Sequence, residues 1–240
     1  MDTELSDTIQ HNLKMLRERI DKAAIRAGRE SSEIDVVAVT KQKSAAVIKS
    51  LVELGVNKIG ESYLNETLFK MDLLKDYDIE WHMIGAIQKG KERRIVPKFS
   101  EVHSVENLEM AKSLDKYSGL DGKILPVYLE FNVSGEDSKH GWPAWREPGW
   151  MDLLADMEET LGLDNIKIMG LMTMAPYSAD AEDARPYFAK LRKLRDFFSK
   201  NIAGYKGNGL SMGMSGDFEV AIEEGATVLR IGSAIVGQRN

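Results

Sequence analysis

The chain has 240 residues, of which 43% are hydrophobic and 29% are charged, the balance of an ordinary globular protein with material for a large core. Its net charge of −6 argues against nucleic acid as the main partner, and the absence of cysteine excludes disulfides and cysteine–zinc sites. The acidic start lacks the features of a signal peptide. No apolar run reaches the roughly 18 residues of a membrane span. We therefore expect a cytoplasmic protein without a membrane partner.

The first element expected along the chain is an amphipathic helix. Its apolar residues recur every three or four positions and form one stripe, Leu5, Ile9, Leu13, Leu16 and Ile20. We expect Ser6 to cap the start of this helix and Gly28 to end it. The run at 36–39 follows, with β-branched residues on both faces, which is typical of a strand buried in a parallel sheet.

Eight strand-like segments then alternate with helix-like segments. The expected strands are 36–39, 58–60, 81–85, 101–105, 124–133, 168–173, a segment ending near 211–214, and 228–231. The expected helices between them are 45–54, 63–74, 89–96, 108–114, 151–161, 184–198 and 218–224. This alternation predicts parallel βαβ units. We predict one domain over residues 1–240, an α/β fold consisting of a single (β/α)₈ TIM-type barrel with an extra N-terminal helix. The turn after the first strand, 40–43, lacks the glycines of a dinucleotide-binding fold.

Candidate site residues follow the strands, because such barrels place their active sites at the carboxyl ends of the strands and bind phosphate after strands seven and eight. The first strand leads to Lys41, which shares a face with Val37 and Val39 and so points along the barrel axis if these line it. Small residues fill the loops at 211–217 and 230–233, where backbone N–H groups can approach an anion. Each loop alone is equally explained as a tight turn. Together with the lysine, they indicate a phosphorylated aldehyde or ketone held as an imine.

Other chemistries find less support in the sequence. The four histidines, His11, His82, His103 and His140, show no paired metal-ligand spacing, and we predict no metal site. No nucleophile-elbow motif is present. The basic residues at 89–94 are expected on a solvated helix surface. The segment 142–150 holds three of the four tryptophans, and we expect this loop to pack its own aromatic side chains on the barrel rather than to form a lid.

Several segments of the chain resemble those of the pyridoxal phosphate homeostasis proteins. They occur in the same order over about residues 13–237: Val39-Thr40-Lys41, Gly60-Glu61-Ser62-Tyr63, Trp81-His82-Met83-Ile84-Gly85, Asn132-Val133-Ser134-Gly135-Glu136, Gly170-Leu171-Met172-Thr173, 210–218 and Arg230-Ile231-Gly232-Ser233. That family in turn resembles the barrel half of bacterial alanine racemase. The chain departs from the family pattern at Ser62, where asparagine is usual, at 85–88 and in the tryptophan-rich segment.

The resemblance implies that pyridoxal 5′-phosphate is bound as an imine on Lys41. It implies phosphate contacts from Ser215, Gly232 and Ser233, and it places Arg230 near the pyridine nitrogen. We also expect Ser62 and Met212 to contact the cofactor. The family is associated with vitamin B6 and amino-acid homeostasis, and apo-enzymes that receive the cofactor are conceivable partners. The resemblance further implies a monomer.

Three functions are compatible with these residues: a non-catalytic cofactor carrier, a pyridoxal-phosphate-dependent amino-acid racemase or decarboxylase, and a cofactor-free aldolase with an imine lysine. We favour the carrier. An arginine has only donors and so meets an unprotonated pyridine nitrogen, which weakens the electron sink that catalysis requires. The resemblance implies that alanine racemase adds a tyrosine from a second domain, which we do not expect here. A barrel residue such as Tyr63 could substitute for it as the second acid or base, but we favour the alternative that none does.

Overall fold

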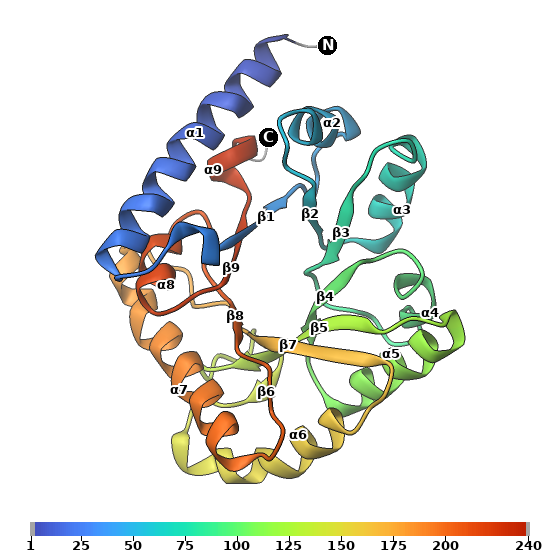
Figure 1. The fold of residues 1–240 in the computed structure, drawn as a ribbon, viewed down its shortest axis with the longest axis vertical. Coiled ribbons are helices and arrows are strands. Elements are labelled where there is room, and N and C mark those ends of the chain that lie inside the picture. The colour runs from blue at the N-terminus through green and yellow to red at the C-terminus, as the bar shows by residue number, and fades with distance from the viewer. Residues whose placement is uncertain (1–2, 239–240) are drawn as a thin grey trace.

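The computed structural model describes residues 3–238, and they form a closed barrel of parallel strands surrounded by helices (Figure 1). The barrel strands are β1 (Asp35–Val39), β2 (Lys58–Glu61), β3 (Glu80–Met83), β4 (Glu101–Val105), β5 (Leu125–Asn132), β7 (Ile166–Met172), β8 (Gly209–Ser211) and β9 (Val228–Ile231). Consecutive barrel strands pair in parallel, and the pairing of β9 with β1 closes the ring. The predicted TIM-type barrel is therefore confirmed.

Helices lie along the outside of the ring, and those between α1 and α9 connect successive strands. They are α1 (Thr3–Arg26), α2 (Ala45–Glu53), α3 (Leu64–Leu73), α4 (Glu92–Ile95), α5 (Leu108–Asp121), α6 (Leu154–Leu161), α7 (Arg185–Asn201), α8 (Phe218–Glu223) and α9 (Ser233–Val236). Short 3₁₀ segments lie at Ser31–Glu33, Glu147–Leu153 and Ala181–Ala184. The extra N-terminal helix α1 packs against α2, α8 and α9 (Figure 1). Within residues 3–238, none of these helices combines the length and the apolar character needed to cross a membrane.

The ends of some elements differ from those expected. Ser6 does not cap α1, because the helix already includes Thr3, and the Thr8 hydroxyl donates to the Glu4 carbonyl within it. Gly28 follows the end of α1 with a φ of 64°, so the predicted stop is confirmed. Helix α5 runs seven residues past its expected end at 114, to 121, and stops where Gly122 adopts a φ of 70°. The short elements β6 (Trp142–Pro143) and α9 were not predicted, since neither is long enough to show a hydrophobic period.

The interior of the barrel and the layer beneath the helices form two separate apolar clusters. Strand alternation sends Val37 into the barrel and Ala38 toward the helices, as expected for β1. The inner cluster is small and contains Val37, Tyr128, Met172 and Val228. Between β7 and β8 the backbones are very close, because a Cβ at Gly170 would lie 1.9 Å from the carbonyl oxygen of Gly209. Polar side chains take up much of the remaining interior, as described below.

The tryptophan-rich segment packs on the outside of the barrel, as predicted. Trp142 is buried and stacks on Phe131 of β5 with ring centroids 5.5 Å apart. Trp150 is also buried, and its indole N–H donates to the Ala144 carbonyl at 3.0 Å. Trp145 is 40% exposed. Two of the three rings thus have a structural role in covering the barrel.

Candidate functional site

Two adjoining cavities open at the carboxyl ends of the barrel strands. The first has a volume of about 500 Å³ and is lined by five predicted site residues, Lys41, Ser215, Arg230, Gly232 and Ser233. The second, of about 520 Å³, is lined by Lys41 and Ser62 together with Tyr63, Glu130 and His140. Lys41, Ile84 and Met174 line both. Volumes of this size suit a small-molecule ligand or cofactor, and Lys41 stands at the boundary between the two spaces.

Met212 is not placed at this site. Its side chain is completely buried in the apolar layer between the barrel and the helices, and it lines neither cavity. Strand alternation explains the difference, because Ser211 faces the barrel interior and the next residue therefore faces outward. The Met212 side chain therefore does not reach either cavity, and the contact between Met212 and a cofactor stays a prediction.

Lys41 occupies a tight turn directly after β1. The N–H of Lys43 donates to the Thr40 carbonyl at 2.9 Å, which closes the turn around Lys41 and Gln42. Gln42 has a φ of 63°, a left-handed conformation that is uncommon for a residue other than glycine. Its N–H donates to Glu66 Oε1 at 2.7 Å. An unusual backbone conformation that the surroundings hold in place is a frequent feature of functional sites.

A buried ion pair holds this turn from below. Lys70 of α3 is 3% exposed, and its Nζ donates to Glu61 Oε1 at 2.6 Å and to the Thr40 carbonyl at 2.9 Å. The Thr40 hydroxyl donates to the same Glu61 oxygen at 2.7 Å. Glu66 joins the group through Lys70 Nζ at 2.5 Å. Burial is the largest influence on Glu61 and raises its pKa, whereas the hydrogen bond from Lys70 lowers it. This cluster fixes the position of Lys41 relative to α3.

The loops after β8 and β9 meet on the opposite wall of the first cavity. The N–H of Ala234 donates to the Ser215 hydroxyl at 3.1 Å, which joins the two loops directly. Gly213 has a φ of 95°, and a Cβ there would lie 2.6 Å from that of Ala221, so the loop after β8 requires glycine at this position. Asp217 accepts from the N–H of Met214 at 2.6 Å and steadies the same loop. Burial raises the pKa of Asp217.

Arg230 lies at the floor of the first cavity. It is 4% exposed, and its two terminal nitrogens donate to the Ser211 hydroxyl at 2.6 Å and to the Thr173 carbonyl at 2.9 Å. Burial lowers its pKa to about 10, which leaves the guanidinium charged at neutral pH. A guanidinium has five N–H donors. Two are used in these bonds, so others can serve a ligand in the cavity.

Below Arg230, the barrel contains polar side chains that the sequence did not single out. His103 Nδ1 lies 2.8 Å from Ser211 Oγ, and His103 Nε2 lies 2.7 Å from Glu101 Oε1 and 3.0 Å from His82 Nδ1. His82, Glu101 and His103 are close enough together to ligate a metal ion. Glu101 and His103 alternate on one face of β4, but no sequence spacing reveals the cluster, because His82 comes from the neighbouring strand β3. The available signal was weaker: each histidine lies between two residues of a buried strand.

The second cavity has a buried carboxyl group of its own. Glu130 of β5 is 4% exposed, and burial raises its pKa to about 7, although the charge of Arg230 acts in the opposite direction. Tyr63, which also lines this cavity, is 49% exposed. The space beside Lys41 therefore has a carboxyl that titrates near neutrality and an accessible phenol.

The site residues fit a small anionic carbonyl compound. Lys41, Lys43 and Arg230 supply positive charge around the first cavity, and the hydroxyls of Ser215 and Ser233 can donate to phosphate oxygens. Gly216 has open space where a Cβ would project, so an anion can approach its backbone. Two carboxylates, Asp180 and Asp217, also line this cavity, and Asp217 Oδ1 already accepts a backbone hydrogen bond. The three cationic side chains therefore outnumber the two carboxylates.

Comparison with known proteins connects this geometry to named families. Residues 6–240 match the family model described as alanine racemase, N-terminal domain. The chain is 41% identical to the pyridoxal phosphate homeostasis protein of Aquifex aeolicus, over 95% of this chain and 96% of that protein. It is 32% identical to the protein of that name from Escherichia coli, with 97% of each chain covered.

Solved structures of related proteins have the same fold as this chain. PipY of Synechococcus elongatus, in a structure without PLP, superposes with a TM-score of 0.84 at 29% identity, over 95% of this chain and all of that one. The PipY structure with PLP bound gives a TM-score of 0.82 at the same identity and coverage. An alanine racemase of Clostridium difficile gives 0.72 at 16% identity, covering 97% of this chain and 60% of that one. The last similarity concerns the fold alone.

Proposed function

The chain belongs to the family of pyridoxal phosphate homeostasis proteins, and we propose that it holds pyridoxal 5′-phosphate at the barrel mouth as an imine on Lys41. The observation that carries this proposal is the position of Lys41, anchored on a tight turn and lining both cavities. PipY, whose structure contains PLP, covers nearly the whole chain and supports the choice of ligand. A lysine at the boundary of a cationic cavity is suited to capture an aldehyde that carries a phosphate.

The remaining contacts follow from the walls of the first cavity. Ser215, Gly232 and Ser233 bind the phosphate, because their loops are joined there and offer hydroxyl and backbone donors. Arg230 donates to the pyridine nitrogen from the cavity floor. Ser62 contacts the ring from the side of the second cavity. Charge-assisted hydrogen bonds to a phosphate contribute roughly 1.5–3 kcal/mol each, so the phosphate loops provide much of the affinity.

In this proposal the protein is a carrier that acts in vitamin B6 and amino-acid homeostasis without efficient catalysis of its own. Bound pyridoxal phosphate promotes reactions by withdrawing electrons from an attached amino acid, most strongly when its ring nitrogen is protonated. Arg230 has only donors and therefore favours the unprotonated nitrogen. Its pKa of about 10 keeps it in this form at neutral pH. We further propose a cytoplasmic monomer that delivers the cofactor to apo-enzymes.

The imine is tested by borohydride reduction of the protein loaded with pyridoxal 5′-phosphate, followed by peptide mass analysis. We expect the pyridoxyl adduct on Lys41 and the loss of near-visible absorbance in Lys41→Ala. Lys43→Ala is the matched control, because Lys43 lies in the same turn and should leave the adduct in place. An adduct confined to another lysine would contradict the assignment. A purified protein that already carries pyridoxal phosphate would also exclude a cofactor-free aldolase.

The phosphate assignment is tested at Gly232. A Cβ there meets only ordinary contacts, the nearest at 3.5 Å from the Val39 carbonyl, so a small substitution need not disturb the fold. Gly232→Val should weaken pyridoxal 5′-phosphate much more than unphosphorylated pyridoxal, as measured by titration of the absorbance. Equal weakening of both ligands would place the phosphate elsewhere.

A second candidate function is an amino-acid racemase or decarboxylase. The observation in its favour is that Tyr63 and Glu130 line the cavity beside Lys41 and offer a phenol and a carboxyl to a bound amino acid. The test is the exchange of the Cα hydrogen of alanine, serine and glutamate for deuterium on the loaded protein. Turnover of about 1 s⁻¹ or faster would lie in the range of ordinary enzymes and would favour this function over the carrier. Transfer of the cofactor to an apo-enzyme, without such exchange, would support the carrier.

A further inference from the structure

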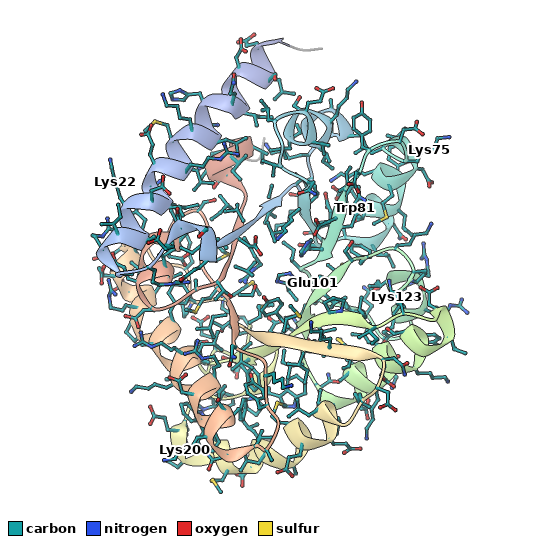
Figure 2. The ribbon with its side chains drawn as sticks, viewed as in Figure 1. Lys22, Lys75, Trp81, Glu101, Lys123 and Lys200 are labelled. Atoms are coloured by element: carbon teal, nitrogen blue, oxygen red, sulfur yellow. The ribbon has the colours of Figure 1, made fainter. Side chains whose placement is uncertain are left out.

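A continuous chain of hydrogen bonds crosses the barrel interior beneath the candidate site. Arg230 donates to Ser211 Oγ at 2.6 Å, Ser211 Oγ lies 2.8 Å from His103 Nδ1, and His103 Nε2 lies 2.7 Å from Glu101 Oε1. His103 and Ser211 are completely buried, and Glu101 lies inside the ring of strands in Figure 2. The chain joins β9, β8 and β4, so it connects opposite parts of the barrel wall. The proposed role of Arg230 does not by itself account for His103 or Glu101.

The donor and acceptor in each bond can be assigned from the arginine. A guanidinium only donates, so the Ser211 oxygen accepts from it. The Ser211 hydroxyl then has its own proton to give, and His103 Nδ1 is the acceptor within reach. The proton of a neutral His103 is therefore on Nε2, which points to the Glu101 carboxylate. Burial lowers the pKa of His103 to about 4, and the bonds to His103 and His82 hold that of Glu101 at about 2 despite burial. The directions of the hydrogen bonds and these pKa shifts therefore agree on a neutral His103 protonated on Nε2 beside an ionised Glu101.

This direction of hydrogen-bond donation, from Arg230 through Ser211 and His103 to Glu101, argues against a metal ion on His82, Glu101 and His103. The Nε2 proton of His103 lies between His103 Nε2 and Glu101 Oε1, and a cation bound to both groups would displace it. Nδ1 would then carry the proton and donate to Ser211, and the serine hydroxyl would lose its acceptor. His82 Nε2 is already buried without a hydrogen-bond partner in residues 3–238. The hydrogen-bonded arrangement satisfies more of the groups that the structure brings together.

We propose that His103 and Ser211 are positioning residues that aim Arg230 at the ring nitrogen of the bound cofactor, with Glu101 fixing the tautomer of His103. This inference rests on the proposed function. Arg230 is held on one side by the Thr173 carbonyl and on the other by Ser211, whose lone pair faces the guanidinium because its hydroxyl is committed to His103. Without that acceptor the hydroxyl is free to rotate, and the guanidinium loses one of its two fixed contacts.

The test compares pyridoxal 5′-phosphate with its 1-deaza analogue, in which carbon replaces the ring nitrogen. The analogue keeps the aldehyde and the phosphate, so it measures every contact except the one from Arg230. In His103→Leu and Ser211→Ala we expect the dissociation constant of pyridoxal 5′-phosphate to rise about three- to tenfold, the size of one hydrogen bond, with little change for the analogue. The result is the ratio of the two dissociation constants. A general loss of folded protein affects both ligands equally and therefore does not change this ratio.

Two further variants define the mechanism. His103→Gln should restore most of the selectivity, since its amide oxygen can accept from Ser211. His82→Gln, the matched control beside the chain, should retain it as well, because His82 does not contact Ser211 or Arg230 in the bonds described. Equal effects on both ligands in His103→Leu, or no effect on either, would overturn the proposal. So would stoichiometric Zn²⁺ binding by the wild type that His103→Leu abolishes.

The outcome separates this inference from the proposed function. If the wild-type protein forms no imine with pyridoxal 5′-phosphate, the proposed function fails. If it forms the imine with normal affinity but the two ligands respond alike in the variants, the positioning role alone fails.

Discussion

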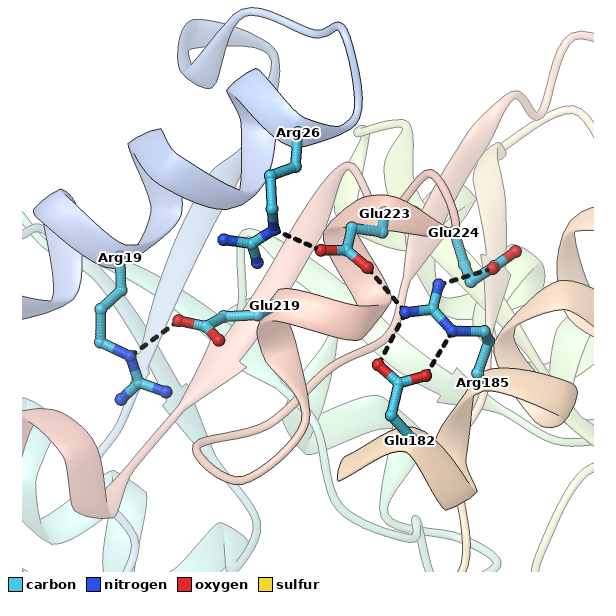
Figure 3. A network of polar contacts seen from close by, with 7 residues as sticks. All are labelled: Arg19, Arg26, Glu182, Arg185, Glu219, Glu223 and Glu224. Atoms are coloured by element: carbon cyan, nitrogen blue, oxygen red, sulfur yellow. Dashed lines mark hydrogen bonds and ion pairs between the residues drawn. The ribbon is translucent and has the colours of Figure 1, made fainter. Parts of the chain in front are cut away.

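Buried and exposed ion pairs of this barrel have similar nitrogen–oxygen distances, but they differ in how far water reaches them. On the outside, a network of arginines and glutamates joins α1, α7 and α8 (Figure 3), with Arg185 contacting three carboxylates at 2.6–3.0 Å. Its side chain is 33% exposed. Inside, Lys70 meets Glu61 at 2.6 Å with side-chain exposures of 4% and 0%. Water screens the first set of charges and is largely excluded from the second. Burial, more than the number of contacts, should therefore decide what each group contributes.

The largest effect is expected when the buried ion pair is broken. Lys70→Met removes the cation and leaves Glu61 buried with the Thr40 hydroxyl as its remaining partner. Breaking a buried pair in this way typically costs about 3–5 kcal/mol of the free energy of unfolding. Urea unfolding measures this loss. Borohydride labelling of the folded fraction should also show slower imine formation. The turn that carries Lys41 loses the hydrogen bond that Lys70 donates to the Thr40 carbonyl.

The matched control is Lys58→Met. Lys58 pairs with Asp35 at 2.7 Å, but the two side chains are 30% and 59% exposed. An exposed pair of this kind contributes about 0–1 kcal/mol. Similar losses for Lys70→Met and Lys58→Met would contradict the distinction between buried and exposed pairs.

A somewhat smaller effect is expected at Glu130, and it should depend on pH. Burial raises the pKa of this carboxyl from an ordinary 4.5 to about 7 in the folded protein. A raised folded-state pKa means that the stabilising contribution is complete below about pH 4.5 and is lost as the pH rises through 7. At about pH 8 the wild type should be less stable than Glu130→Gln by up to about 3 kcal/mol, relative to their difference at pH 4.5. Urea unfolding across this range tests it, and parallel curves for the two proteins would refute the shift.

The smallest effect is expected in the outer network. Arg26 pairs with Glu223 at 2.7 Å, and the two side chains are 50% and 22% exposed. Arg26→Gln should lower the free energy of unfolding by less than about 1 kcal/mol at low salt, and the difference should shrink further at about 1 M salt, where screening is strong. Arg185 remains paired with Glu223 in this variant, which limits the loss further. A salt-independent loss of several kcal/mol would show that the network acts as a buried group does.

The fold was predictable because its determinants are local. Apolar residues repeat with a helical period in α1, and short β-branched runs mark strands such as β1, so their alternation predicts a parallel barrel. The position of Lys41 at the barrel mouth, where it lines both cavities, was predictable in the same way from one strand end and the rule for barrel active sites. The loops of Ser215 and Gly232 were recognised by their small residues and their order in the chain. Each of these inferences needs only neighbouring residues and a known architecture.

The groups around Lys41 and Arg230 were decided by tertiary structure. Lys70 is indistinguishable in the sequence from a solvated helix lysine, and its burial follows from the packing of α3 on β2. His103 and Ser211 are 108 residues apart and meet because both face the interior of a closed barrel. The side chain of Met212 faces the outer apolar layer because the preceding residue, Ser211, faces the barrel interior. The sequence by itself determined the order and character of the elements. Which inward side chains meet depends on strand register and barrel closure, which no local pattern specifies.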